Sequence, residues 1–493
     1  MAGDRPNILF VMADQLTASA LPFHGGPADA PHIERLGEEG VVFDAAYCTT
    51  PLCAPSRASL LTGRLPSELG TYDNAAEFGA SIPTVAHHLR DRGYATSLAG
   101  KMHFIGPDQL HGFEERLTTD VYPAGFDWIP DWTLAPSERL LWYHDLTAVL
   151  DAGPREATLQ LDYDEEVGFR SVRKLWDLAR DRTRPFFLLV SFTHPHDPYE
   201  IPRRYWNRYE DRDLPAPQVP PRALDQHDPH SRRVLEMCGA DEVEIPAEAT
   251  ARARRAYYAA VSYVDEKVGE LLRALDETGL RDDTIVVFGS DHGDMLGERG
   301  LWYKMTFFED SARVPLVVHA PGRLAPKRVH EPVSLADLLP TLVDLSGAET
   351  ERSLGPLLRG ESFEPRTVAC EYLAEGTQAP AVMLREGSLK YIHCPGDPDL
   401  LFDLDAHPLE LENLAPEHPD TDRLKARVER DWDFDALAGK VVASQQRRLL
   451  VARALEKGEP APWDYVPPDR SSRRYVRGRD FRAPFSGARL PPE

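Results

Sequence analysis

Each of four short apolar runs ends in acidic, basic or imidazole side chains, and this pattern constrains the fold of the chain more than any other feature. The runs are "NILFVMADQ" (residues 7–15), "YATSLAGKMHF" (94–104), "PFFLLVSFTHPHDPY" (185–199) and "DTIVVFGSDHGD" (283–294). Short runs of this kind, bounded by turn signals, are typical of strands buried on both faces. Because helical patterns lie between them, the sequence predicts an α/β fold with a large, mostly parallel sheet flanked by helices.

The rest of the chain predicts a smaller second unit and a tail. Residues 366–458 combine further strand patterns with long helical patterns, as expected of a C-terminal α+β subdomain. Residues 459–493 are rich in proline and arginine and poor in aliphatic side chains, so they cannot form a core of their own. We therefore predict a catalytic α/β domain over residues 1–365, a subdomain over 366–458 and an extended tail over 459–493. The proline-rich residues 195–221 are predicted to form one long loop near the site.

Polar side chains follow the predicted strands. In open α/β sheets, ligands bind at the carboxyl ends of the strands, so the polar ends of the four runs are expected to meet. Asp14, Asp291 and His292 offer two carboxylates and an imidazole there, and Gln15 adds an amide oxygen. An oxygen-rich set of this kind favours Ca²⁺, Mg²⁺ or Mn²⁺. The alternative is that these residues only cap helices or form ion pairs.

Cations and further imidazoles complete the candidate site. Arg57, Lys101 and Lys304 suit a tetrahedral oxyanion, while His103 and His196 are candidate acids and bases near neutral pH. A divalent metal, clustered cations and two imidazoles together favour sulfuryl or phosphoryl transfer.

The stretch "TTPLCAPSRASLLTGRLP" (residues 49–66) places Cys53 at the predicted start of a helix that stops at Gly63. The free N–H groups and the positive dipole end of a helix start suit an anion, and they also make a cysteine there acidic and reactive. The alternative is a small buried thiol that packs against the sheet.

Charge and cysteine usage narrow the partners and the compartment. A net charge of −24 argues against binding to nucleic acid or to an anionic membrane surface. The 5 cysteines are scattered, so they form neither a disulfide framework nor a zinc ribbon. The N-terminus leads directly into a strand, with no secretion signal and no run of membrane-spanning length. These features predict a cytoplasmic protein with no nucleic-acid or membrane partner.

The stretch "CAPSR" fits the C-x-P-x-R signature of the formylglycine-dependent sulfatases, and "ASLLTGRLP" resembles the continuation of that signature. The runs "NILFVMADQ", "GKMHF", "HPHDP" and "GSDHGDMLGERGLWYKMTFFE" occur in the order found in the family. Within the family the chain resembles the choline sulfatases, over roughly residues 5–400 and again in the tail segments "WDY" and "SSRRYVR". The tail then departs from that pattern in "GRDFRAPFSGARLPPE".

The resemblance implies an alkaline-phosphatase-like fold and a formylglycine nucleophile, which a separate formylglycine-generating enzyme makes from Cys53. It also implies one divalent metal, Ca²⁺ with Mg²⁺ or Mn²⁺ as alternatives. The implied metal ligands are Asp14, Gln15, Cys53, Asp291 and His292. Gln15 stands where many sulfatases carry a second aspartate, which lowers the charge of the ligand set.

Catalytic roles follow from the same resemblance. Arg57 and Lys101 would hold the modified cysteine and the sulfate oxygens, and Lys304 and His196 would face the leaving oxygen. His103 would take a proton from the remaining hydroxyl group, which expels sulfate and restores the aldehyde.

The implied reaction is the hydrolysis of choline sulfate to choline and sulfate. A quaternary ammonium has no N–H donor, so aromatic faces and carboxylates must hold it. The aromatic segment of residues 126–146 and the resemblance together single out a substrate pocket formed by Asn74, Trp128, His144 and Glu375. Glu371 and Asp480 are further carboxylate candidates. Most aromatic residues of the segment are expected only to anchor it to the sheet.

Two other functions stay open. A phosphonate monoester or phosphodiester hydrolase on the same scaffold would need a similar metal and similar cations. A non-catalytic protein that binds an anion or a metal would result if Cys53 is left unmodified. Because chains of the family assemble through the C-terminal extension, we expect a homodimer or homotetramer. His194, two residues before His196, is interpreted as structural.

Overall fold

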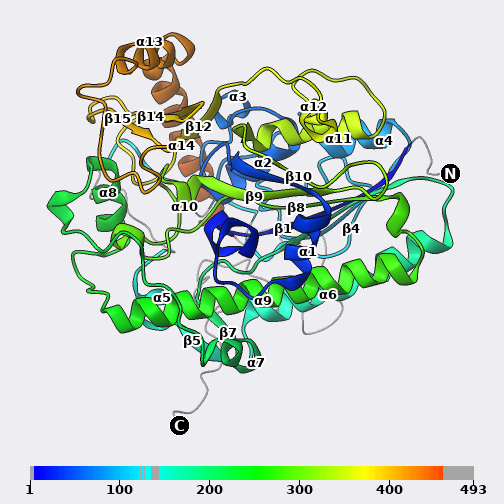
Figure 1. Ribbon diagram of the computed structural model, residues 1–493. Coiled ribbons are helices and arrows are strands. Elements are labelled where there is room, and N and C mark those ends of the chain that lie inside the picture. The colour runs from blue at the N-terminus through cyan, green and yellow to red at the C-terminus, as the bar shows by residue number, and fades with distance from the viewer. Residues whose placement is uncertain (1–4, 123, 127, 135–143, 459–493) are drawn as a thin grey trace.

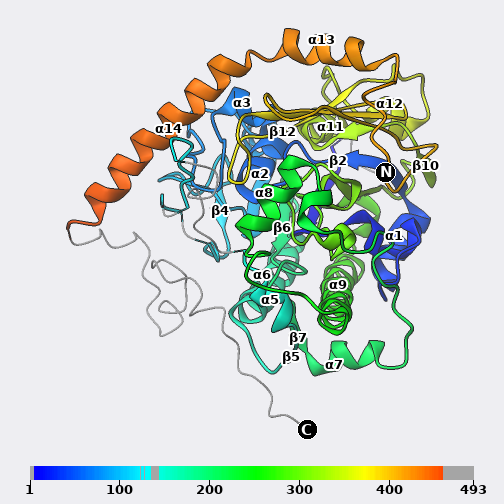
Figure 2. The ribbon, with the colours of Figure 1, turned by 90° about the vertical axis from the view of Figure 1, so that its left-hand side faces the viewer.

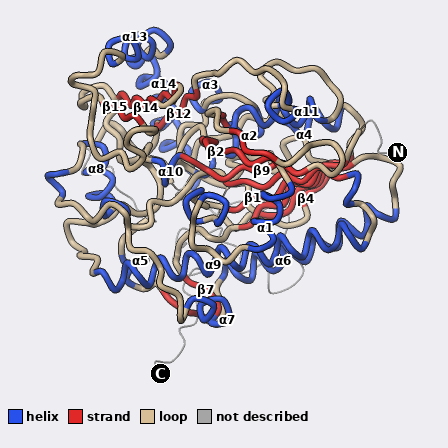
Figure 3. Tube along the Cα trace, viewed as in Figure 1, coloured by secondary structure: helices blue, strands red, loops and turns tan. Residues whose placement is uncertain are grey.

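A nine-stranded mixed sheet lies in the middle of the molecule in the computed structural model, which describes residues 5–122, 124–126, 128–134 and 144–458 (Figure 1). The strand order is β10-β2-β9-β8-β1-β6-β3-β4, and β11 pairs with the end of β2. Figure 3 shows the strands of this sheet side by side between the helices. The strands are β1 (Asn7–Ala13), β2 (Val41–Tyr47), β3 (Ala95–Gly100), β4 (Glu115–Arg116), β6 (Phe186–Phe192), β8 (Thr284–Ser290), β9 (Arg313–His319), β10 (Lys327–Val329) and β11 (Val333–Ser334).

The sheet is mostly parallel, as the sequence predicts. Only β9 runs against its neighbours β2 and β8, and the other pairings in this sheet are parallel. Every residue of the central strands β1, β6 and β8 is buried. Helices that cover both faces therefore account for the uninterrupted apolar runs.

Helices lie on both sides of the sheet, with α2, α4 and α11 on one face and α1, α6 and α9 on the other (Figure 1). The α-helices are α1 (Pro31–Glu39), α2 (Cys53–Thr62), α3 (Pro66–Leu69), α4 (Val85–Asp91), α5 (Thr147–Leu150), α6 (Leu159–Arg180), α7 (Arg203–Trp206), α8 (Pro229–Met237), α9 (Ala247–Glu277), α10 (Glu309–Ala312), α11 (Leu338–Leu345), α12 (Gly355–Arg359), α13 (Thr421–Asp431) and α14 (Phe434–Leu455). Short 3-10 helices are η1 (Ala18–Ala20), η2 (Pro22–His24), η4 (Asn207–Tyr209), η5 (Leu224–Gln226), η6 (Arg281–Asp283), η7 (Glu298–Gly300) and η8 (Leu335–Asp337).

A second, antiparallel sheet follows in the chain. It consists of β12 (Val368–Tyr372), β13 (Ala381–Glu386), β14 (Leu389–His393) and β15 (Leu400–Asp403). The helices α13 and α14 come after it, and α14 runs down the outside of the molecule (Figure 2). The chain divisions at residues 365 and 458 stay predictions, and the tail lies outside the described residues.

The proline-rich residues 195–221 differ from their prediction as one long loop. They contain the strand β7 (Glu200–Pro202) and the helix α7, and β7 pairs in parallel with β5 (Gly153–Arg155). Pro202 is the last residue of a strand in a two-stranded sheet, and both strands of such a sheet are edge strands, which tolerate proline.

Among the described helices, none combines the length and the apolar character that crossing a membrane requires.

Candidate functional site

The central strands end in register, and their polar end residues meet. Ala13 of β1 pairs with Phe192 of β6 and with Ser290 of β8. The residues that follow Ala13 and Ser290 therefore lie side by side, and the N–H of Gln15 donates to Asp291 Oδ1 at 3.1 Å. The expected convergence at the carboxyl ends of the strands is present.

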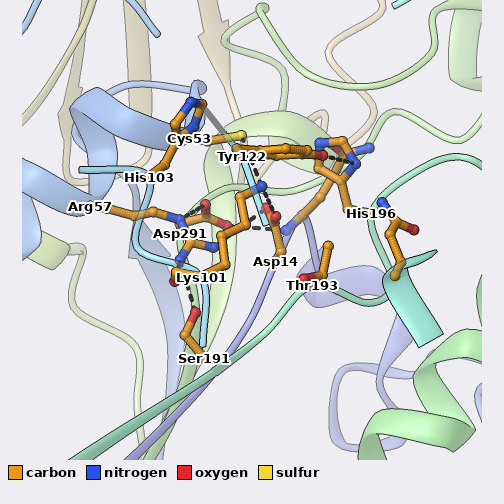
Figure 4. A network of polar contacts seen from close by, with 12 residues as sticks. Asp14, Cys53, Arg57, Lys101, His103, Tyr122, Ser191, Thr193, His196 and Asp291 are labelled. Atoms are coloured by element: carbon orange, nitrogen blue, oxygen red, sulfur yellow. Dashed lines mark hydrogen bonds and ion pairs between the residues drawn. The ribbon is translucent and has the colours of Figure 1, made fainter. Parts of the chain in front are cut away.

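Cys53 is the first residue of α2 and faces these strand ends (Figure 4). Leu52 before it is extended, and Gly63 after the helix adopts φ 69°, which is the left-handed stop that the sequence predicts. The Sγ atom lies 3.2 Å from Nε2 of His292 and 3.8 Å from Nζ of Lys101. The thiol is only 1% exposed.

Four side chains form a cluster that fits a divalent metal. Ligand atoms of Asp14, Cys53, Asp291 and His292 lie within 4.8 Å of one another. Oδ1 of Asp14 is buried and has no hydrogen-bond partner among the described residues. Burial lowers the pKa of His292 to about 4, which keeps its imidazole neutral, as a metal ligand must be.

Gln15 is held beside this cluster by both ends of its amide. Its Oε1 accepts from Lys304 Nζ at 2.5 Å, and its Nε2 donates to Asp294 Oδ2 at 2.6 Å and to Asp197 Oδ1 at 3.2 Å. The hydroxyl of Tyr199 also donates to Asp294. Burial raises the pKa of Asp294 to about 6. The amide oxygen of Gln15 therefore faces Lys304, and its role as a metal ligand stays a prediction.

Arg57 and Lys101 neutralise the carboxylates. Nε of Arg57 donates to Asp291 Oδ2 at 2.7 Å, Nη1 donates to Ser191 Oγ at 2.8 Å, and Lys101 pairs with Asp14. Burial alone would raise the pKa of Asp14, but Lys101 and Arg57 outweigh burial and hold it well below its usual range. Both cations therefore lie among the carboxylates of the cluster, and their role in holding a substrate anion stays a prediction.

Lys304 and His196 form a second polar pair. Lys304 Nζ donates to Nε2 of His196 at 2.8 Å, and Nδ1 of His196 donates to the carbonyl of Asp197 at 2.6 Å. Burial, helped by Lys304, holds the pKa of His196 well below its usual range. The pKa of Lys304 is raised, because Cys53 and Asp197 outweigh its burial.

His103 lies beside Cys53 (Figure 4) and contacts two aromatic rings. Its ring centre is 5.2 Å from that of Tyr122 and 5.4 Å from that of Trp128. The backbone N–H of His103 donates to Asp120 Oδ2 at 2.8 Å. Burial lowers the pKa of the His103 imidazole.

Non-glycine residues with left-handed backbone recur in the site. Gln15, His103, Tyr303 and Met305 have φ values of 62°, 55°, 64° and 76°. Such residues cost ~1–3 kcal/mol each and persist only where their surroundings hold them. Two of the four flank Lys304, so the path of the chain there is determined by its surroundings.

The predicted substrate-pocket aromatics contact other candidate site residues, Trp128 through His103 and His144 through His196. Trp128 is half-buried and packs edge-on against Tyr122 at 5.4 Å. His144 stacks on Tyr303 at 4.7 Å, and its Nδ1 is 3.3 Å from Asp197 Oδ2. Burial lowers the pKa of His144 to about 4.

The other pocket candidates divide by their partners. Asn74 Oδ1 accepts from the N–H of Ala54 at 3.0 Å, so it lies at the start of α2. Glu375 is buried in the segment after β12. Glu371 instead binds Ser67 and the indole N–H of Trp432, which gives it a structural role.

His194 and Trp132 make structural contacts. Nδ1 of His194 lies 2.7 Å from Asp164, as a structural histidine would. Trp132 anchors its segment, because its indole N–H donates to the carbonyl of Ala374 at 2.9 Å. Asp480 lies outside the described residues.

Sequence reasoning missed several residues that shape the site. Asp197 and Asp294 stand inside the runs "HPHDP" and "GSDHGD", so their place after predicted strands was an available signal. Tyr122 and Ser191 carry no local signal, since nothing near them in the sequence marks a contact with Lys101 or Arg57.

Three family models match the chain. The model described as "Sulfatase" matches residues 6–348. The model "N-sulphoglucosamine sulphohydrolase, C-terminal" matches residues 297–432, and "Choline sulfatase enzyme C terminal" matches residues 439–479. The last match begins inside α14.

Curated proteins of two kinds illustrate the similarity over most of the chain. A choline-sulfatase of Rhizobium meliloti (strain 1021) is 49% identical over 501 residues, which cover 97% of this chain and 96% of that protein. An arylsulfatase of Clostridium perfringens (strain 13 / Type A) is 29% identical and covers 83% of this chain and 90% of that protein.

Solved structures share the fold. The phosphonate monoester hydrolase of Agrobacterium radiobacter has a TM-score of 0.68 at 23% identity and covers 89% of this chain and 96% of that one. The phosphonate monoester hydrolase of Silicibacter pomeroyi has a TM-score of 0.68 at 24% identity and covers 87% of this chain and 94% of that one. At these identities the likeness concerns the fold alone, and the predicted alkaline-phosphatase-like fold is confirmed.

Proposed function

The chain belongs to the sulfatase family and hydrolyses sulfuric esters, and from that premise we propose that its substrate is choline sulfate, which it converts with water to choline and sulfate. The observation that carries the proposal is the 49% identity to a choline-sulfatase over 97% of the chain. The positions of Trp128 and His144 against the catalytic cluster support it, because an aromatic wall suits a trimethylammonium group.

Sulfatases generally use a formylglycine and a divalent metal, and the residues present fit both. We propose that Asp14, Gln15, Asp291 and His292 hold the metal beside residue 53, and that the metal is Ca²⁺, since oxygen donors dominate the set. When bound, the cation would draw negative charge from the sulfate oxygens.

Cys53 supplies the side chain that the formylglycine-generating enzyme would convert, and a hydrated aldehyde there offers a hydroxyl that can attack sulfur. Arg57 and Lys101 would hold negative charge at this end of the substrate, since both are buried cations within the cluster. His103, whose pKa is lowered by burial, would accept a proton from the hydroxyl of the converted side chain.

Departure of choline needs a proton on the ester oxygen. Lys304 carries one, and its hydrogen bond to His196 places an imidazole next to it as a relay. Asn74 and Glu375 would line the rest of the substrate pocket, together with Trp128 and His144.

Mass analysis and a substrate panel test the proposal. The peptide that contains Cys53, from cells with the modifying enzyme, should show sulfur replaced by an aldehyde oxygen, and Cys53→Ala should be folded and inactive. Choline sulfate should be hydrolysed faster than an aryl sulfate, a phosphonate monoester or a phosphodiester. Faster turnover of a phosphonate or phosphate ester would instead support the related hydrolase activity. Full activity with an unmodified thiol would contradict the nucleophile.

The metal is tested separately. Asp14→Asn and Asp291→Asn should lower both the bound metal measured by elemental analysis and the turnover of sulfate esters. Chelation should inactivate reversibly, and Ca²⁺ should restore activity better than Mg²⁺ or Mn²⁺. Activity that survives exhaustive removal of metal would contradict the assignment.

We also propose a cytoplasmic location and assembly as a homodimer or homotetramer. All five cysteines are buried free thiols, which suits a reducing compartment. The proposed partners are the formylglycine-generating enzyme and further copies of the same chain, which would contact one another through residues 459–493.

A further inference from the structure

The C-terminal helix α14 contacts three separate segments that carry candidate substrate-pocket residues. Two apolar residues of its buried face, Leu437 and Val441, pack in one cluster with Tyr72, Trp132 and Leu373. These three partners stand within four positions of Asn74, Trp128 and Glu375 along the chain. One helix therefore anchors all three segments from outside the large domain (Figure 2).

Arg448 makes the strongest of these contacts. Its Nη1 and Nη2 donate to the two carboxylate oxygens of Asp73, each at 2.7 Å. Both side chains are buried, and Nε of Arg448 also donates to Ser444 at 3.2 Å. A bidentate arginine–carboxylate pair fixes orientation as well as distance.

The contact continues toward the nucleophile through one peptide bond. Asp73 is followed by Asn74, whose Oδ1 accepts from the N–H of Ala54 at 3.0 Å. Ala54 directly follows Cys53 in the first turn of α2, where backbone N–H groups lack helical partners. Arg448 therefore reaches the start of α2 through two hydrogen-bonded steps, although 375 residues separate it from Asp73.

Asp73 cannot hold this loop alone. Its Oδ1 accepts from the N–H of Ala75 at 2.9 Å, but its second oxygen is buried and is bonded by Arg448. Removing the guanidinium would leave a buried carboxylate without its counter-charge, and the loop would move to hydrate it. Asn74 would move with the loop.

A second anchor acts on the aromatic segment. Oε1 of Gln445, one turn before Arg448, accepts from the backbone N–H of Trp132 at 2.9 Å. The indole of Trp132 in turn donates to the carbonyl of Ala374, next to Glu375. The same helix face thus ties the aromatic segment to the segment after β12.

We propose that Arg448 is a positioning residue for sulfuric-ester hydrolysis: through Asp73 it holds Asn74 on the first turn of α2 and so sets the place of the nucleophile against the substrate. The inference rests on the proposed sulfatase function. It does not depend on choline as the substrate, because the start of α2 serves every sulfate ester.

A double-mutant cycle tests the inference. Arg448→Met and Asn74→Ala should each lower kcat for an aryl sulfate roughly tenfold, and the double variant should lose about as much as the larger single loss, because both changes break one connection. Arg448→Lys, which keeps the charge but not the bidentate geometry, should lose less and serves in the cycle if Arg448→Met does not fold. Losses that multiply to roughly a hundredfold, or an unchanged kcat in folded Arg448→Met, would overturn the proposal.

Arg427→Met is the matched control. Arg427 lies on α13 in the same subdomain, where it binds Glu386 and Thr367. Its loss should lower the melting temperature with little change in kcat. The cycle is measured on an aryl sulfate, so its result does not depend on choline as the substrate. If the unaltered enzyme hydrolyses the aryl sulfate but not choline sulfate, the choline assignment fails and the cycle still tests Arg448. If the unaltered enzyme hydrolyses no sulfate ester, the proposed function itself is overturned.

Discussion

Lys304 and His196 share one hydrogen bond, and its direction shows where the mobile proton resides. An ammonium group has no lone pair, so Lys304 donates and Nε2 of His196 accepts. Burial holds the pKa of His196 well below its usual range. Burial also lowers the pKa of Lys304, but Cys53 and the nearby carboxylates outweigh it and raise that pKa, and the carboxylates remain when Cys53 is converted. The proton for a departing alcohol is therefore stored on Lys304.

Replacing Lys304 should discriminate between leaving groups. Lys304→Met should slow hydrolysis of choline sulfate by about 10²–10⁴-fold, the usual contribution of a general acid. A nitrophenyl sulfate should be affected much less, since nitrophenolate leaves without a proton. Steady-state rates on both esters measure the difference. Equal losses would show that Lys304 only fixes Gln15.

Trp128 and Trp132 lie four residues apart but have different surroundings, and this allows a matched comparison. Trp128→Ala should weaken binding of choline sulfate by about 1–2 kcal/mol, the range for a desolvated cation–π contact. An aryl sulfate should be nearly unaffected. Trp132→Phe removes an anchoring hydrogen bond and part of a buried ring, so it should affect both substrates alike. If Trp128→Ala also lowers both equally, Trp128 is scaffold.

At the scale of elements, one buried acidic side chain of α9 accepts a hydrogen bond from the first turn of α1. Oδ1 of Asp265 on α9 accepts from the N–H of Ile33 at 2.7 Å in the first turn of α1. Burial raises the pKa of Asp265 from 3.8 to about 7, and the hydrogen bonds from backbone N–H groups oppose the rise only in part. The folded protein therefore retains a proton here that the unfolded chain loses above about pH 4.

The contribution of Asp265 to the free energy of unfolding should accordingly fall as the pH rises through this interval. Asp265 contributes a slope of up to about −1.4 kcal/mol per pH unit between roughly pH 4 and 7. In Asp265→Asn this contribution is absent, so the free energy of unfolding of the unaltered protein should fall relative to that of the variant over the same range. Denaturant unfolding of both proteins at several pH values gives the comparison. Parallel curves would contradict the raised pKa.

Strands, motifs and the metal cluster could be predicted because each has a local signature. An apolar run followed by Asp14, or by Asp291 and His292, predicts a buried strand with polar residues at its carboxyl end. The reversed direction of β9 could not be predicted, since "RVPLVVH" is equally apolar in either direction. The contact of Arg448 with Asp73 joins residues 375 positions apart, and no local pattern marks either partner.

At the scale of the whole molecule, the end of α14 presents an apolar surface. Leu450 is 61% exposed and Leu455 is 62% exposed, and Val451 lies between them. Isolated exposed aliphatics are common, but three within two turns at the start of the tail suit contact with another chain.

We propose that residues 459–493 and the exposed end of α14 contact another chain together. Removing residues 459–493 should then lower the mass of the assembly in solution. We expect the full chain to be a dimer or tetramer and the truncated chain to be smaller, as measured by light scattering on a sizing column. Leu450→Glu with Leu455→Glu should have the same effect in the full chain, because two charges would be buried at the interface. A monomer both before and after truncation would contradict the assembly.

The burial of Cys53 has a consequence for synthesis in the cell. Every residue from Cys53 to Thr62 is buried in the finished fold, so the proposed formylglycine-generating enzyme would have to bind "CAPSR" while this segment is still unfolded. Under that proposal, conversion and folding would compete in time, and a chain that folds first would keep its thiol. The specific activity of a preparation would therefore depend on how fast its chains were made and folded. Supplying the modifying enzyme later would not convert the chains that had already folded.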